Sequence, residues 1–401
     1  MFQLSVNGRK AVFSKFFAAA DAAAVLGAVE GAGRVVFVDT PATAVLVGVV
    51  KTLTENGVKV VVRDHHDVVA PRNPREAEVA AAAARIRELV GANALISDRA
   101  THPACSSLIA TGEFAGEGTV VVADPDPDGL TAAMKGLGVV YPELDRDAAV
   151  LDGPRAEQTA ERLSPLAALL TRAMSALPAY DAGRPQVSED AKGKLFADFV
   201  SAVEARAVLE KYRPTGQCPF CGYPGEVEGG CCPDSANGTP WPEFPDHLRS
   251  VEATALAAEG RMAEMALAYE AGVLEAKRLA ATVQDILPGV AYVDAVAAAR
   301  FDLGTLASAM EARPGVVVTV QRKSAGPIAA AERKAGRAAV QLSLAVVRAK
   351  QAEVNLQAFL PAGFTSSPEK GVISNTSFLL HVSEGVWEET VLPALRAKFG
   401  A

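Results

Sequence analysis

The chain of 401 residues has few aromatic side chains, few histidines and no excess of basic residues. Aromatic residues make up 6% of it, there are five histidines, and the formal net charge is −8. Broad binding of nucleic-acid duplexes requires a basic surface that neutralises phosphates, and channels for single strands also use aromatic stacking. The composition therefore disfavours both classes of protein, although a small local basic cleft is compatible with it.

The chain also lacks a long apolar run and a targeting segment. No uninterrupted apolar stretch reaches the length of about 20 residues that a membrane-spanning helix needs. Residues 1–17 lack a basic segment followed by a long apolar core and a cleavage site. We therefore expect no association with the membrane and a location in the cytoplasm.

Cysteine is scarce and unevenly distributed. Four of the five cysteines crowd into one Pro/Gly-rich stretch, which excludes an even disulfide framework and is typical of a reducing compartment: Cys218, Cys221, Cys231 and Cys232, with Cys105 alone. The Cys-Pro-Phe-Cys spacing presents two thiolates on one turn and predicts a structural zinc site, with His247 or Asp234 as a further ligand. Free or disulfide-paired cysteines are the alternative.

The remaining composition is that of a globular protein, with 50% apolar and 21% charged residues. Short apolar runs at residues 34–38, 58–62, 93–97, 118–123, 138–141 and 148–151 predict strands, and helical patterns lie at 41–53, 75–90 and from 130. Strands that alternate with helices indicate the α/β class, with a mostly parallel sheet covered on both faces. We expect a catalytic domain over residues 1–153, a helical region over 154–285 that contains the cysteine stretch 214–247, and a smaller α+β domain over 286–401.

Acidic groups follow four of the predicted strands directly. In a parallel sheet, ligands bind beyond the carboxyl ends of the strands, so these groups are expected to converge. So many carboxylates repel one another unless cations lie between them. Carboxylates with imidazoles suit Mn²⁺ or a similar ion, whereas oxygen ligands alone favour Mg²⁺ or Ca²⁺. A lone Asp after a strand is more often a turn former or a helix N-cap, which is the alternative for each residue taken singly. The set comprises Asp39, Asp64-His65-His66, Asp98, Asp124, Asp126 and Asp128.

The sequence Asp64-His65-His66 after an apolar strand resembles the signature of the DHH phosphoesterases. The run from Asp124 to Asp128, which continues Gly-Leu-Thr-Ala-Ala, is similar to that family's first motif. Asp39 matches its second motif, and Asp98 with the small residues after it matches its fourth. The motifs run in the order second, third, fourth, first, which a circular permutation would produce without changing a site built from strand ends.

The resemblance implies roles for these residues. It implies two metal ions held by Asp39, His65, Asp98, Asp124, Asp126 and Asp128, with Mn²⁺ as the first candidate and Mg²⁺ as the second. His66 would face the substrate phosphate, and Asp64 would orient the ring of His65. Asp152, expected at the end of the strand at 148–151, competes with Asp98 for the last ligand position.

The C-terminal part would grip the substrate, although it lacks the Gly-Gly-Gly-His run that often marks this domain in the family. Arg322 and Lys323 follow a predicted strand and are candidates for binding phosphate, with a solvated turn as the alternative. Overall we expect a phosphodiesterase that cleaves short oligonucleotides or cyclic dinucleotides. The alternatives are a RecJ-type exonuclease acting on single strands from the 5′ end, an enzyme for small phosphates, and a non-catalytic binding protein. The oligomeric state stays open, with a dimer among the alternatives.

Overall fold

Six strands form the first sheet, in the order β1-β2-β6-β3-β4-β5. Strands β2 to β6 pair in parallel, and β1 joins β2 as an antiparallel edge hairpin. The predicted α/β class with a mostly parallel sheet is therefore confirmed. The strands are β1 (Phe2–Val6), β2 (Arg9–Phe13), β3 (Arg34–Val38), β4 (Lys59–Asp64), β5 (Ala94–Ile96) and β6 (Thr119–Ala123).

This computed structural model describes residues 1–16, 18–71, 74–139, 141, 143–152, 161–177, 180–181, 189–212 and 244–400. The predicted zinc ligands Cys218, Cys221, Cys231 and Cys232, together with Asp234, lie outside the described residues. The predicted zinc site accordingly stays a prediction.

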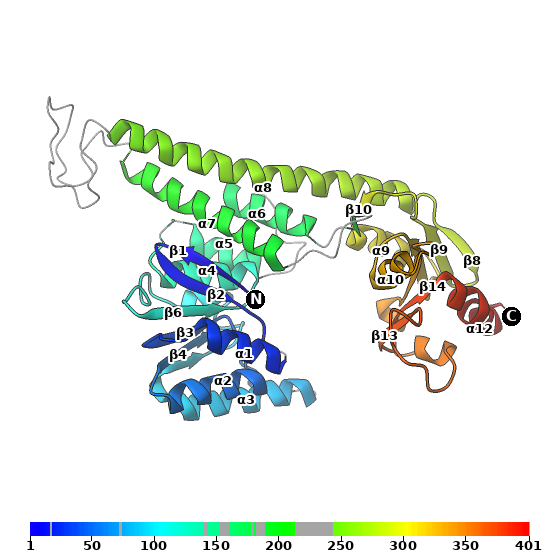
Figure 1. Cartoon of the computed structure of the whole chain (residues 1–401), viewed down its shortest axis with the longest axis horizontal. Helices are drawn as coiled ribbons and strands as arrows, with labels where there is room; N and C mark the ends of the chain where they lie inside the picture. Colours follow the sequence, from blue (N-terminus) through cyan, green and yellow to red (C-terminus); the bar gives the residue numbers. More distant parts are fainter. Residues whose placement is uncertain are drawn as a thin grey trace. The chain divides into compact units, whose positions relative to one another are not determined.

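Helices cover both faces of the first sheet (Figure 1). Side chains that alternate along the strands, such as Val35, Phe37 and Val62, pack against α1 (Ala19–Ala28), α2 (Ala44–Glu55) and α3 (Pro74–Val90) in one apolar cluster. The opposite face is covered by α4 (Pro127–Gly136), which packs on β6 and β3, and by α5 (Leu144–Leu151), which packs on α4. Burial on both faces explains why β3 and β4 read as continuous apolar runs.

Two of the predicted strands are wrong. Residues 148–151 belong to helix α5, because Leu144, Ala148 and Leu151 are buried at a helical spacing of three to four residues. Gly138, Val139 and Tyr141 lie outside any strand. The hairpin β1–β2 was not predicted, although its turn Asn7-Gly8, with positive φ at both residues, is the usual signal for one. Short apolar runs leave helix and strand ambiguous, and here tertiary packing decides between them.

The chain forms two compact units, Met1–Ala173 with Glu189–Glu264, and Met174–Ser188 with Met265–Ala401. The predicted helical region 154–285 is divided between them. It contains α6 (Pro165–Ala176), α7 (Glu189–Tyr212) and the long α8 (Phe244–Ala280). In the first unit, α7 packs on the hairpin through an aromatic cluster of Phe2, Phe13 and Phe196. No described helix is both long and apolar enough to cross a membrane.

The second unit contains a six-stranded sheet in the order β13-β14-β12-β11-β9-β8. Strands β9 and β11 pair in parallel and the other neighbours are antiparallel, which agrees with the predicted α+β composition. A short pair, β7 (Tyr180–Asp181) and β10 (Arg300–Phe301), belongs to the same unit. The sheet comprises β8 (Gln284–Leu287), β9 (Val290–Asp294), β11 (Val318–Lys323), β12 (Gln341–Val346), β13 (Val372–Thr376) and β14 (Leu379–Ser383).

Helices pack on this second sheet and enclose two apolar clusters. Val318, Leu342 and Leu380 belong to one cluster, and Ala291, Val293 and Leu306 belong to the other. The helices are α9 (Leu303–Glu311), α10 (Pro327–Lys334), the short α11 (Glu384–Val386), a π-helical turn (Trp387–Val391) and α12 (Leu392–Phe399).

Candidate metal centre

The acidic residues that follow β3, β4 and β6 meet at the carboxyl edge of the first sheet, as predicted. Asp39 directly follows β3, Asp64 ends β4, and Asp128 lies in the first turn of α4 after β6. Strands in this part of the sheet are parallel and in register, so their ends lie side by side. The side chains of Asp39, Asp64, His65 and Asp128 are at most 1% exposed.

His65 lies at the middle of this cluster. Its Nε2 is 3.1 Å from Asp39 Oδ1, 3.1 Å from Asp128 Oδ2 and 4.0 Å from Asp152 Oδ2. Its Nδ1 lies 2.9 Å from the carbonyl oxygen of His102, which can only accept, so Nδ1 carries a proton. In the neutral ring, Nε2 then presents its lone pair to the carboxylates, which is the arrangement of a metal-binding imidazole.

Several buried polar atoms at this point have no hydrogen-bond partner. They are both carboxylate oxygens of Asp39, Oδ1 of Asp128, Oδ2 of Asp64 and Nε2 of His65. Buried polar atoms in folded proteins are almost always satisfied, so a group of them around one point indicates a missing ligand. Carboxylate oxygens with one imidazole nitrogen are the donor set that a first-row divalent ion such as Mn²⁺ takes, so the residues fit the predicted metal.

The carboxylates repel one another in the absence of cations. Burial, followed by the charges of Asp128 and Asp126, raises the pKa of Asp39 well above its ordinary value. Burial and Asp126 raise the pKa of Asp124 to about 7. Burial also raises the pKa of Asp128, although its close contact with His65 acts to lower it. Cations placed between these groups would remove the repulsion.

Two sets of three side chains offer ligand atoms within 4.8 Å of one another. One is Asp39, His65 and His66, and the other is His65, Asp128 and Asp152. Asp152 follows α5 and so comes from a helix end, whereas the sequence predicted the end of a strand. The two sets share His65, and the predicted pair of metal ions stays a prediction. Asp126 lies beside Asp39, and its carboxylate also accepts the N–H of Gly129, which caps α4.

Asp98, predicted as a ligand, makes its contacts within its own turn. Its carboxylate accepts hydrogen bonds from the backbone N–H groups of Ala100 and Thr101 and from the Thr101 hydroxyl. These bonds hold the pKa of Asp98 below its ordinary value. In the described part of the chain, Asp98 belongs to neither set of ligand atoms. Asp152 takes the position beside His65 and Asp128 that the sequence analysis gave to Asp98.

The predicted role of Asp64 is also corrected. Asp64 Oδ1 accepts a hydrogen bond of 2.7 Å from His66 Nδ1, so it orients His66, while the carbonyl of His102 orients His65. Arg99 then donates to His66 Nε2 at 2.8 Å and to Asp152 Oδ1 at 2.9 Å. His66 is held from both sides, and 20% of its side chain is exposed.

The sequence pattern did not identify Arg99 or Cys105 as parts of this site. Arg99 comes from a turn without secondary structure, and an arginine beside an aspartate carries no signal by itself. The Cys105 side chain contacts the backbone N–H of Asp39 and the carbonyl of Arg63, and its own N–H donates to Asp128 Oδ2. Only the fold brings these groups together, because the segment between β5 and β6 returns across the sheet edge.

In the second unit, the two residues predicted to bind phosphate differ in whether their charge is paired. Arg322 donates to Asp294 and to Glu384, so its charge is balanced within the protein. Lys323 is 9% exposed, with no hydrogen bond or ion pair among the described residues.

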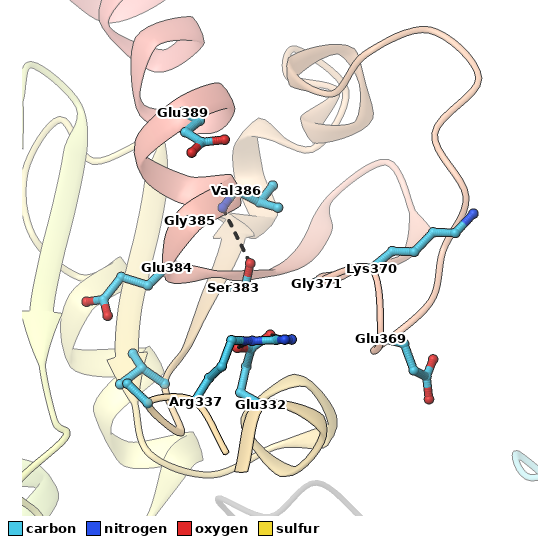
Figure 2. A pocket seen from close by; sticks show the side chains of 12 residues that line it. Glu332, Arg337, Glu369, Lys370, Gly371, Ser383, Glu384, Gly385, Val386 and Glu389 are labelled. Carbon is cyan, nitrogen blue, oxygen red and sulfur yellow. Dashed lines mark hydrogen bonds and ion pairs between the residues drawn. The ribbon is translucent and has the colours of Figure 1, made fainter. Parts of the chain in front are cut away.

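The second unit also contains a pocket of about 460 Å³, which lies between α10, the loop at 369–371 and the turn at 383–389 (Figure 2). Carboxylates outnumber cations along its lining, which makes it unsuited to a phosphate.

Comparison with known proteins gives weak likenesses. No family model matches the chain, and no curated protein sequence matches it. A solved pGpG-specific phosphodiesterase from Vibrio cholerae aligns with a TM-score of 0.31 and 10% identity, over 91% of this chain and 98% of that chain. A second solved structure, a DHH domain from a member of a family of ribosomal proteins, aligns with a TM-score of 0.26 and 14% identity, over 90% of this chain and 68% of that chain. Likenesses of this size establish neither fold nor activity.

Proposed function

We propose that the protein is a metal-dependent phosphodiesterase of the DHH type that hydrolyses short oligonucleotides or cyclic dinucleotides with the help of two Mn²⁺ ions. The observation that carries the proposal is the position of His65 Nε2, 3.1 Å from both Asp39 and Asp128, among buried oxygen atoms without hydrogen-bond partners. Cations bound at this point would satisfy these buried acceptors together. Mg²⁺ is the second candidate ion.

The order of the strands supports the proposed permutation. In space, the strands that carry the predicted first, second, third and fourth motifs lie next to one another as β6, β3, β4 and β5. If β6 came first in the chain, the four strands would follow the sheet in sequence. A permutation would therefore change the order of the strands along the chain. It would leave the same strand ends next to one another in the sheet.

The side chains around the cluster would have two roles, metal binding and contact with the substrate. Asp39, His65, Asp128 and Asp152 would hold the ions, with Asp124 and Asp126 beside them. When bound, the ions supply the Lewis acidity that phosphodiester hydrolysis uses. Asp64 and Arg99 fix the ring of His66 in one tautomer, with Nδ1 as donor to Asp64. His66 is thereby oriented to contact a phosphate oxygen, and the guanidinium of Arg99, 52% exposed, adds a positive charge at the rim.

Two lysines lie near Asp124 and would favour an anionic substrate. Lys192 Nζ donates to the carbonyl of Pro125 at 3.0 Å, and the charges of Lys15 and Lys192 both act to lower the pKa of Asp124. These cations offset part of the acidity that would otherwise repel a phosphodiester.

Hydrolysis of three labelled substrates tests the proposal: a linear dinucleotide, a cyclic dinucleotide and a longer single strand, each with Mn²⁺ and after EDTA. We expect Mn²⁺-dependent cleavage of the first two that chelation abolishes. Preferred digestion of the long strand from its 5′ end would favour the RecJ-type alternative. Protein that contains metal but cleaves none of the three would point to a small phosphate as the substrate.

Substitution of one ligand separates an enzyme from a binding protein. Asp128→Asn keeps the shape of the side chain but removes its charge, so we expect turnover to fall by a factor of about 10³ or more. Asp285→Asn, at an exposed carboxylate that pairs with Arg313 in the second unit, is the matched control and should retain full activity. If wild-type protein binds neither metal nor substrate, the enzymatic proposal is wrong.

A further inference from the structure

The loop that joins β6 to α4 carries three carboxylates but has few backbone donors of its own. Pro125 and Pro127 have no N–H group, so neither can anchor the loop by a backbone hydrogen bond. The charges of Asp124 and Asp126 repel each other, which acts against a compact loop. A segment with like charges and few donors needs contacts from other elements to stay in one conformation.

Lys192, in the first turn of α7, makes such a contact. Its Nζ donates a hydrogen bond of 3.0 Å to the carbonyl oxygen of Pro125, which lies between Asp124 and Asp126 in the chain. Burial raises the pKa of Asp124 to about 7, and the charge of Lys192 acts against this shift. One half-buried ammonium therefore both holds the backbone of the loop and offsets part of its negative charge.

Close packing fixes the part of α7 that carries Lys192. The next residue, Gly193, approaches β1 so closely that a Cβ there would lie 3.1 Å from the ring of Phe2. One turn further on, Phe196 packs edge to face against Phe2 and Phe13. Strand β2, which contains Phe13, pairs in parallel with β6, the strand that leads into the loop. The helix and the loop are thus joined through the hairpin, all within the first unit.

We propose that Lys192 is a positioning residue of the metal centre, through which α7 holds the loop at 124–128 in the conformation that directs its carboxylates to the cluster. The inference rests on the proposed function in one respect, that the acidic cluster binds metal. It assigns a role in the site to a helix that lies outside the α/β sheet and far from the acidic motifs in sequence.

Two other roles for Lys192 predict different effects on Mn²⁺ binding. A cation that acts only through its charge repels Mn²⁺, so its removal would tighten binding. A residue that only contacts the substrate would leave Mn²⁺ binding unchanged when no substrate is present. A positioning residue holds the ligands in place, so its removal weakens Mn²⁺ binding even though a positive charge is lost. The direction of the change therefore distinguishes the three roles.

Calorimetric titration of the full chain with Mn²⁺, without substrate, measures this direction. It compares wild-type protein with Lys192→Met, Lys192→Arg and the control Lys194→Met, at an exposed lysine of the same helix. We expect Lys192→Met to weaken Mn²⁺ affinity by about tenfold or more, as loss of a group that supports a ligand does. Lys192→Arg keeps a charged donor and should restore most of the affinity, and Lys194→Met should match wild-type protein.

Hydrogen exchange in EDTA tests the loop without metal. The N–H groups of Gly129 and Leu130 both donate to Asp126 and so report on the conformation of the loop. Because a hydrogen bond from a charged donor is lost, we expect these two amides to exchange about tenfold faster in Lys192→Met than in wild-type protein. The amides of β3 should keep their protection, and the melting temperature should stay the same. A lower melting temperature with faster exchange throughout β3 would overturn the proposal, because Lys192 would then support the whole fold.

The remaining outcomes separate this inference from the proposed function. Mn²⁺ binding that is tighter or unchanged in Lys192→Met, or unchanged exchange of Gly129 and Leu130, would overturn the positioning role alone. Wild-type protein that binds no Mn²⁺ would overturn both. Wild-type protein that binds Mn²⁺ but hydrolyses no phosphodiester would overturn the proposed function and not the role of Lys192.

Discussion

At the scale of the residue, the proposed metal centre depends on contacts that fix the proposed ligands as well as on those ligands themselves. Asp39 has φ of 52°, a left-handed conformation that aspartate tolerates better than most residues. Its N–H lies 2.9 Å from the carbonyl of Arg63 and 3.2 Å from Cys105 Sγ. These bonds hold the backbone in the conformation that directs the carboxylate toward His65.

Replacement of Cys105 tests this support. Cys105→Ala removes the sulfur that contacts both Asp39 and Arg63, whereas Cys105→Ser keeps a donor and an acceptor. Loss of a group that supports a ligand typically weakens metal binding by about 10- to 100-fold. We therefore expect a weaker Mn²⁺ affinity for the alanine variant and partial rescue by serine, as measured by calorimetry. Identical affinities for all three proteins would show that the sulfur has no such role.

A matched pair of substitutions decides between the two candidate ligands. Asn in place of Asp98 can still accept the N–H groups of Ala100 and Thr101 through its side-chain oxygen, so Asp98→Asn should leave Mn²⁺ affinity within about twofold. Asp152→Asn removes a carboxylate 4.0 Å from His65 Nε2 and should weaken Mn²⁺ binding by about tenfold or more. The opposite result would restore the role that the sequence predicted for Asp98.

At the scale of the element, the loop between β6 and α4 is constrained by close backbone packing. A Cβ on Gly129 would lie 2.3 Å from the carbonyl oxygen of Asp124, so the loop that carries Asp124, Asp126 and Asp128 can close only with glycine at this position. The cap of α4 by Asp126 uses the N–H of this same glycine. The positions of the three acidic side chains in this loop thus depend on the glycine at position 129.

Two glycine-to-alanine variants test the constraint. Gly129→Ala must displace the backbone of Asp124, so we expect a loss of stability of about 2 kcal/mol or more and a loss of Mn²⁺ binding. Gly48→Ala, within α2 and with open space around the new methyl group, should instead gain up to about 1 kcal/mol from helix propensity and leave metal binding unchanged. Denaturant unfolding with calorimetry measures both. Normal Mn²⁺ binding by Gly129→Ala would contradict the argument.

At the scale of the whole molecule, the two units should respond to acid in opposite directions. Burial raises the pKa of Asp124 from 3.8 to about 7, so the folded metal-free first unit binds a proton that the unfolded chain releases. Its stability therefore falls as pH rises from about 4 to 7. Burial lowers the pKa of His381 from 6.5 to about 4, so the second unit loses stability as pH falls through this range, by about 3 kcal/mol.

Hydrogen exchange of the protein in EDTA, followed by mass spectrometry, resolves the two units. Between pH 6.5 and 4, corrected for intrinsic rates, we expect protection of β3 and β6 to increase and protection of β12 and β14 to decrease. His381→Gln should abolish the decrease in the second unit without affecting the first. A parallel change in both units, or an unchanged response in His381→Gln, would show that other groups dominate.

The sequence by itself determined the α/β class, the mostly parallel sheet, and the convergence of Asp39, His65 and Asp128. Each follows from periodicity and from the rule that parallel strands end at one edge, which depend on neighbours along the chain. Tertiary structure alone decided that residues 148–151 are helical, that Asp152 rather than Asp98 lies beside His65, and that Asp64 orients His66. It also decided that Cys105 and Arg99 contact the cluster and that Lys323 is buried. These outcomes depend on groups far apart in sequence whose distances are set by packing, and no local pattern encodes a distance between them.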